Sequence, residues 1–91
     1  MTSELTLRMR EIREVETSGR HELSQLVGIN KKTLESLEQT GRAPKGELLQ
    51  AVCSIWPKYT LWLMTGQVNE VTGQVSPEIE KALKQTGTDT D

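Results

Sequence analysis

Cysteine is nearly absent from this 91-residue sequence, since Cys53 is the single one. One cysteine excludes an internal disulfide framework, and this usage is typical of the reducing cytoplasm. The only histidine is His21, and one cysteine with one histidine cannot form a zinc site. We therefore expect a cytoplasmic protein with no metal and no cofactor, and we expect Cys53 to be an inert core residue.

Aromatic residues and long apolar runs are also scarce. The chain has two Trp, one Tyr and no Phe, so the core must consist mostly of Leu, Ile, Val, Met and Ala. No apolar run approaches the roughly 18 residues of a transmembrane helix, and the first residues lack the apolar centre of a secretion signal. A chain of this length is expected to form one small domain with a modest core.

The sequence lacks the patterns on which enzymes depend. It contains no supported Ser/His/Asp arrangement, no glycine-rich phosphate loop and no cluster of Cys and His. We therefore expect that the protein is not an enzyme.

Charge is distributed unevenly along the chain. The net charge is −2, but residues 1–66 hold nine basic and eight acidic side chains, whereas residues 67–91 hold two basic and five acidic ones. Four cations lie within residues 28–45, against two glutamates. Because salt screens charges beyond about 8–10 Å, this local basic excess matters more for phosphate binding than the net charge does.

Helical periodicity dominates residues 1–66 and predicts an all-α fold of five helices. Leu5, Met9, Ile12 and Val15 form the apolar stripe of the first helix. Asn30 suits an N-cap, whereas Gly28 and Gly41 suit helix ends. Four later helices are predicted at 20–27, 31–40, 46–55 and 57–65. The residues expected to face inward on the first two of these are Leu23, Leu26, Val27, Leu34 and Leu37.

Residues 67–91 form a C-terminal extension to the predicted domain of residues 1–66. An extended linker or short strand is expected at 67–75, a short sixth helix at 77–85 and a disordered end after it. Five apolar residues of the extension have no clear place in a five-helix core, so it either packs across a two-fold axis or covers its own domain edge. These five are Val68, Val71, Val75, Ile79 and Leu83.

The helices predicted at 20–27 and 31–40, with three residues between them, have the spacing of a helix-turn-helix. The run "LSQLVGINKKTLESLEQTGRAP", followed by "LWLMTG", resembles the Xre/Cro/phage-repressor helix-turn-helix domains of bacteria and their phages. The resemblance covers about residues 5–66. It implies a compact repressor-like domain that binds double-stranded DNA without a cofactor.

A recognition helix presents its N-terminal residues to base edges in the major groove, and the adjoining helix ends and loops contact phosphates. The resemblance implies that base readers lie on the outward face of the helix at 31–40. They are Lys31, Lys32, Ser36 and Glu35. The phosphate-binding residues that it implies are Arg20, Asn30, Thr33, Gly41, Arg42 and Lys45.

Each of these assignments has a simpler alternative. Lys31 and Lys32 could pair with Glu35 on a solvated helix, and the cations of the following loop could be ordinary surface charges. The resemblance also implies a structural pair between Arg13 and Glu38, which would otherwise be two unrelated surface charges.

The function that these patterns favour is a sequence-specific transcriptional regulator, acting as a repressor. It would bind a palindromic operator as a homodimer, with one helix of each copy in the major groove. The alternative is an antitoxin-like or adaptor module of the same fold that holds a protein partner through residues 67–85. Neither function involves a membrane. Substituting Lys31 and Lys32 distinguishes them, because an adaptor would be indifferent to the loss of both lysines.

Overall fold

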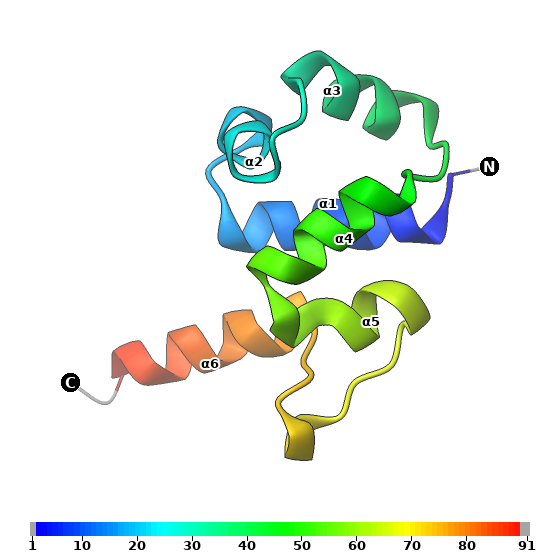
Figure 1. Ribbon diagram of the computed structural model, residues 1–91. Helices are drawn as coiled ribbons and strands as arrows, with labels where there is room; N and C mark the ends of the chain where they lie inside the picture. The colour runs from blue at the N-terminus through cyan, green and yellow to red at the C-terminus, as the bar shows by residue number, and fades with distance from the viewer. Residues whose placement is uncertain (1, 90–91) are drawn as a thin grey trace.

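The computed structural model describes residues 2–89, with the side chains of residues 2–84, and the chain is all-helical over that range. Figure 1 shows α2 and α3 at one end, α1 and α4 crossing in the middle, and α5 and α6 at the other end. The α-helices are α1 (Glu4–Glu16), α2 (Arg20–Val27), α3 (Lys31–Thr40), α4 (Gly46–Ile55), α5 (Thr60–Thr65) and α6 (Pro77–Asp89), and the 3₁₀-helices are η1 (Pro57–Tyr59) and η2 (Glu70–Thr72).

The bounds of α2, α3 and α4 agree with the sequence prediction, because the residues at their ends have the expected capping chemistry. Asn30 Oδ1 accepts a hydrogen bond from the Lys32 N–H at 2.7 Å, which caps α3. Gly28 and Gly41 end α2 and α3 in the left-handed conformation, with φ of 71° at both. At Gly41 a Cβ would also lie 2.8 Å from the Thr2 Cα, so the turn has no room for a side chain.

The single helix predicted at 57–65 is wrong, because the segment divides into η1 and α5. Pro57 fixes φ and lacks an N–H, so a tight 3₁₀ turn forms first, with the Tyr59 N–H donating to the Trp56 carbonyl at 3.0 Å. This turn buries the Tyr59 ring completely. The α-helix begins only at Thr60 and ends at Gly66.

All the α-helices contribute side chains to one apolar core, and α6 does so through Ile79 near its start. Leu23 of α2 is buried and Val27 packs against the core, but Leu26 is 48% exposed, so its predicted inward position is wrong. The reason is that Leu23 and Val27, one turn apart, define the face that α2 turns toward α3 and α4. The buried core residues are Met9, Ile12, Leu23, Leu34, Leu37, Leu48, Val52, Tyr59, Leu63 and Val75.

The C-terminal extension contributes to this same core. Val75 is buried and its N–H donates to the Lys58 carbonyl at 2.9 Å, while Ile79 packs against the core, so these two residues do have a place in it. Neither a strand nor a plain linker precedes them within the described residues: η2 lies inside a narrow turn closed by an isolated antiparallel bridge between Asn69 and Gln74. Val71 at the tip of that turn is 98% exposed.

The sixth helix begins as predicted, at Pro77, with Ser76 Oγ accepting a hydrogen bond from the Ile79 N–H at 3.2 Å. It extends to Asp89, beyond the predicted end at 85, because Gly87 weakens a helix without removing a backbone donor as proline would. The rest of the segment predicted to be disordered, residues 90–91, lies outside the described residues. Over the described range, no helix combines the length and apolar character needed to cross a bilayer.

Candidate functional site

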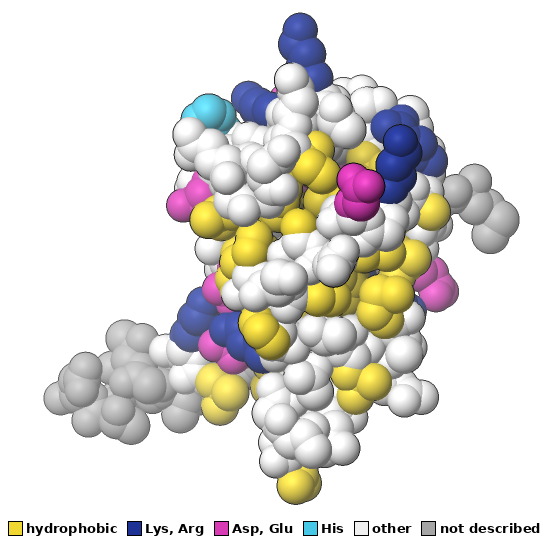
Figure 2. Space-filling view, viewed as in Figure 1, with side chains coloured by type: hydrophobic (Ala, Val, Ile, Leu, Met, Phe, Trp, Pro, Cys, Tyr) yellow, Lys and Arg dark blue, Asp and Glu magenta, His cyan; other side chains and the backbone are white. Residues whose placement is uncertain are grey.

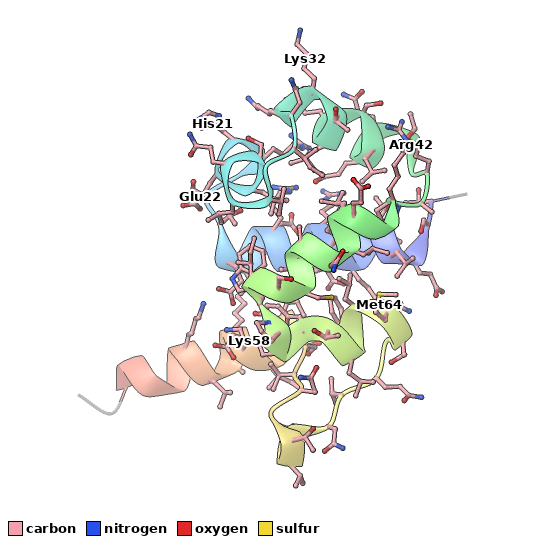
Figure 3. All side chains as sticks on the ribbon, in the orientation of Figure 1. His21, Glu22, Lys32, Arg42, Lys58 and Met64 are labelled. Carbon is pink, nitrogen blue, oxygen red and sulfur yellow. The ribbon has the colours of Figure 1, made fainter. Side chains whose placement is uncertain are left out.

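The outward face of α3 is a polar surface that carries basic side chains. The α3 helix lies at the end of the structure farthest from α6 (Figure 1), with Leu34 and Leu37 buried beneath it. Figure 2 shows Lys and Arg side chains gathered over α3 and over the turn that follows it. Lys32 points away from the body into solvent (Figure 3).

The two lysines of α3 have different surroundings. Lys31 Nζ lies 3.7 Å from Glu35 Oε1, one turn along the helix, and both side chains are exposed. Such a surface pair contributes at most about 0.5 kcal/mol, so it would not prevent Lys31 from contacting another anion. Lys32 forms no ion pair with any side chain of residues 2–84. The simpler interpretation, pairing with Glu35, therefore applies to Lys31 only.

Arg42 belongs to the same surface as α3. Its Nη1 donates to Ser36 Oγ at 3.1 Å and to Thr40 Oγ1 at 3.4 Å, so the guanidinium lies along the C-terminal half of α3. The backbone of the turn is fixed from the other side, because Thr6 Oγ1 donates to the Arg42 carbonyl at 2.6 Å. Thus the structure brings together Ser36 and Arg42, which the sequence assigned to different roles.

A small hollow of about 170 Å³ lies between α3 and the start of α4. Thr33, Arg42 and Lys45 line it, so three of the residues assigned to phosphate surround one depression. Lys45 is the N-cap of α4, which places free backbone N–H groups at the same spot. The other lining residues are Ile29, Leu37, Ala43, Pro44, Glu47 and Leu48.

Glu38 anchors α3 to the two preceding helices. Arg13 Nε and Nη2 donate to the two carboxylate oxygens of Glu38 at 2.9 and 3.0 Å, and Arg20 Nε donates to Oε1 at 3.2 Å. The Glu38 side chain is 6% exposed and that of Arg13 11%. We call these three residues the Glu38 cluster. The cluster contains the pair between Arg13 and Glu38 that the resemblance implied. It also contains Arg20, which was assigned to a DNA phosphate but whose Nε donates to the Glu38 carboxylate in this structure.

A second carboxylate, Glu16, whose side chain is 11% exposed, organises the opposite end of the molecule, and the sequence analysis missed it. Tyr59 Oη donates to Glu16 Oε2 at 2.5 Å, Lys58 Nζ lies 3.1 Å from the same oxygen and 3.0 Å from Glu80 Oε1, and Lys84 Nζ lies 3.6 Å from Glu16 Oε1. These five residues form the Glu16 cluster. The only signal in the sequence was the Lys-Tyr pair after Pro57, which could not reveal partners about 40 residues away.

The titration behaviour of the Glu16 cluster follows from these contacts. Burial alone would raise the pKa of Glu16, but hydrogen bonds from Tyr59 and Lys58 outweigh it and leave that pKa below the usual 4.5. Burial would lower the pKa of Lys58, but its bonds to Glu80 and Glu16 raise it above 10.5. Burial and the adjoining Glu16 carboxylate both raise the pKa of Tyr59.

Metal-ligating groups and unsatisfied buried polar atoms are both absent from the described part of the chain. No group of three or more His, Cys, Asp or Glu in it could hold a metal ion. Every buried side-chain nitrogen or oxygen that the structure describes has a hydrogen-bond partner. The polar groups that remain open to a ligand are therefore those of the exposed surface.

Comparison with known proteins relates the chain to a phage protein. No protein-family model matches the chain. The sequence is 30% identical over 70 residues to the repressor protein C of Escherichia phage P2, and the match covers 75% of this chain and 71% of that protein. With this identity over most of both sequences, the chain belongs to the family of phage repressors that includes the P2 repressor protein C.

Proposed function

We propose that the protein is a transcriptional repressor that binds double-stranded DNA, with α2 and α3 as its helix-turn-helix. The observation that carries the proposal is the surface of α3: a capped helix start with two exposed lysines, one of them without an ion-pair partner within residues 2–84. The name of the P2 relative supports the regulatory role. A small helical chain from a repressor family also indicates a regulator and not an enzyme.

In this proposal α3 enters the major groove, which is about 12 Å wide and admits one helix. Lys31 and Lys32 would donate to guanine O6 and N7 near the start of the helix. One turn further along, Glu35 would accept from cytosine N4 and Ser36 would bond to a base edge. Since Ser36 already accepts from Arg42, the hydroxyl hydrogen of Ser36 stays available for a base.

Phosphates on either side of the groove would contact the helix starts and the hollow. Asn30 lies at the exposed start of α3, and Thr33, Arg42 and Lys45 line the hollow. Gly41, which was also assigned to phosphate, is buried and its N–H already donates to the Leu37 carbonyl at 2.9 Å, so that assignment is wrong. Arg20 contributes less, because its Nε is already bonded to Glu38. Phosphate contacts set register and affinity, whereas the base contacts of α3 set specificity.

A homodimer on a palindromic operator completes the proposal. One α3 helix reads few base pairs, so two copies about one DNA turn apart are needed for operator specificity. Apolar side chains available for the dimer contact lie on α5 and the extension. They are Met64, Val68, Val71 and Leu83, all exposed in the isolated chain.

The test is DNA binding by the variant Lys31→Ala, Lys32→Ala, with operator fragments first selected by the wild-type protein from random DNA. We expect the variant to stay folded and to lose specific binding. Arg42→Ala, Lys45→Ala, at residues proposed to contact phosphate, should instead reduce the slope of log affinity against log salt by about one unit per lost phosphate contact. Lys81→Ala, on α6, is the matched control and should bind DNA as the wild type does.

The alternative role as an antitoxin-like or adaptor module is favoured by one observation, the exposed apolar side chains of residues 67–84. An adaptor would keep its partner when both lysines of α3 are removed. If the wild-type protein selects no duplex sequence at low salt, the repressor proposal is wrong and the adaptor role replaces it.

A further inference from the structure

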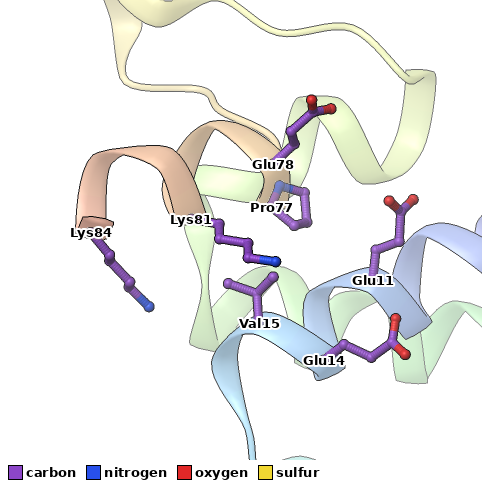
Figure 4. A pocket seen from close by; sticks show the side chains of 7 residues that line it. All are labelled: Glu11, Glu14, Val15, Pro77, Glu78, Lys81 and Lys84. Atoms are coloured by element: carbon purple, nitrogen blue, oxygen red, sulfur yellow. The ribbon is translucent and has the colours of Figure 1, made fainter. Parts of the chain in front are cut away.

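The hollow beside α3 differs from the larger groove between α1 and α6 in how its charged side chains are held. Carboxylates and ammonium groups face one another around that groove, of about 670 Å³, as Figure 4 shows for Glu11, Glu14 and Lys81. Exposed charges of both signs select no ligand there. Arg42, which lines the hollow, is instead held by specific contacts, and Figure 3 shows it at the C-terminal end of α3.

The backbone that carries Arg42 is fixed by the N-terminal part of the chain. The Ser3 N–H donates to the Gly41 carbonyl at 2.6 Å, and the hydroxyl of Thr6, a buried residue, donates to the Arg42 carbonyl at 2.6 Å. Two successive carbonyls of the turn are therefore bonded to the body of the domain. The Arg42 side chain starts from a fixed point beside the end of α3.

The guanidinium of Arg42 is attached to α3 through one nitrogen. Nη1 donates to Ser36 Oγ at 3.1 Å and to Thr40 Oγ1 at 3.4 Å, two side chains that lie one helical turn apart on the same face. Nε and Nη2 have no partner within residues 2–84. Arg42 can thus contact a phosphate through Nε and Nη2 while Nη1 holds Ser36.

This contact determines the polarity of the Ser36 hydroxyl. A guanidinium has no acceptor, so Ser36 Oγ must accept in the bond with Arg42. The hydroxyl hydrogen of Ser36 has no acceptor within residues 2–84. An isolated serine bonds to donor and acceptor groups of bases alike. Beside the positive charge of Arg42, however, a base amino group would be repelled, whereas a base acceptor would receive the free hydrogen.

We propose that Arg42 is a positioning residue that makes Ser36 a hydrogen-bond donor, so that Ser36 selects a base with a major-groove acceptor and rejects cytosine. Guanine fits best because it presents both O6 and N7, and thymine O4 or adenine N7 can also accept. Cytosine presents only its N4 amino group there. The inference rests on the proposed function and deepens it, because it names the class of base that one residue of α3 selects.

The experiment compares affinities for the operator selected by the wild type and for each of its single base-pair substitutions, by fluorescence anisotropy. We expect Ser36→Ala to lose about fivefold of the discrimination against cytosine at one position of each half-site. Arg42→Ala should weaken binding to every sequence, through its lost phosphate contact, and should also lose the discrimination at that same position. The double variant Ser36→Ala, Arg42→Ala should lose no more discrimination there than either single variant.

Lys45→Ala is the matched control, because Lys45 lines the same hollow but does not contact Ser36. It should weaken binding to all sequences equally and keep the base preference. If Arg42→Ala does not fold, Arg42→Lys decides. This variant keeps a charge for phosphate but lacks the fixed guanidinium, so the preference against cytosine should fall while the salt dependence stays.

The inference is overturned if Arg42→Ala weakens binding equally on all sequences, since that is the effect of a phosphate contact alone. Losses of discrimination that add in the double variant, or an unchanged base preference in Ser36→Ala, would overturn it as well. These results would leave the proposed function intact. A wild-type protein that selects no duplex would instead reject the proposed function, and this inference with it.

Discussion

Two largely buried carboxylates, Glu38 and Glu16, hold the two ends of this molecule in different ways. Glu38 is held by two arginines, one of which forms two parallel hydrogen bonds with it, and it ties α3 to α1 and α2. Glu16 is held by two lysines and a tyrosine, and it ties α1 to η1 and α6. One end carries the proposed DNA contact, and the other carries the C-terminal helix.

The difference in side chains has a physical consequence. Planar guanidinium groups fix the orientation of a carboxylate through two directed bonds, whereas an ammonium group is a point charge on a flexible stem. Lys58 and Lys84 also remain partly exposed to water, unlike Arg13. The comparison therefore indicates a rigidly held α3 and a more loosely held α6.

The largest effect is expected from Glu38→Gln. This substitution would leave the largely buried Arg13 charge without its counter-ion, so the free energy of unfolding should fall by about 3–5 kcal/mol, measured by urea denaturation. Glu47→Gln, at an exposed position of α4, should stay within about 0.5 kcal/mol of the wild type. Equal losses for the two variants would show that Glu38 does not anchor α3.

A smaller loss is expected from Glu16→Ala. Removal of the carboxylate leaves the buried Tyr59 hydroxyl without its acceptor, which costs about 1–3 kcal/mol, but Lys58 and Lys84 can turn toward water. Glu16→Gln, which keeps an acceptor for Tyr59, should lose less, and urea denaturation of both variants measures the difference. If Glu16→Ala lowers the free energy of unfolding as much as Glu38→Gln does, the two carboxylates do not differ in how firmly they hold their ends of the molecule.

The pH dependence of stability should report on the end of the molecule that holds the Glu16 cluster. Because the folded pKa of Glu16 lies below 4.5, its contribution is present above that pH and is lost as the pH falls through the lowered pKa. The folded pKa of Lys58 lies above 10.5, so its contribution is present below pH 10.5 and is lost as the pH rises through the raised pKa.

Urea denaturation of the wild type and of Glu16→Gln over a pH series tests this expectation. The difference in unfolding free energy between the two proteins should be constant near neutral pH and should shrink below pH 4.5. A difference that persists undiminished in strong acid would mean that ionised Glu16 does not stabilise the fold.

The smallest effects concern the two helix starts. Asn30→Ala removes the cap of α3 and should cost about 1 kcal/mol, since Asn30 accepts the Lys32 N–H at 2.7 Å. Ser76→Ala removes the longer 3.2 Å bond at the start of α6 and should cost about 0.5 kcal/mol. Thermal unfolding followed by circular dichroism measures both. If Ser76→Ala lowers the stability more than Asn30→Ala does, the start of α6 is held more firmly than the start of α3, contrary to this expectation.

The local structure could be predicted because its causes are local. The limits of α2, α3 and α4 depend on a capping asparagine, left-handed glycines and apolar residues at helical spacing, all visible in sequence. The same patterns could not predict the division at Tyr59 or the exposure of Leu26, because each depends on which neighbour a side chain meets. The interface residues were proposed from resemblance and spacing, and the binding experiment tests their contact with DNA.

The sequence by itself determined where most helices begin and end and which residues of α3 face away from the core, since hydrogen bonding and apolar periodicity act over a few residues. The tertiary structure alone decided that Arg20 turns to Glu38, that Arg42 lies on Ser36, that Val75 completes the core, and that Glu16 holds the C-terminal helix. Charged side chains take the nearest compatible partner in space, and that partner is set by how the helices pack, which no local pattern records.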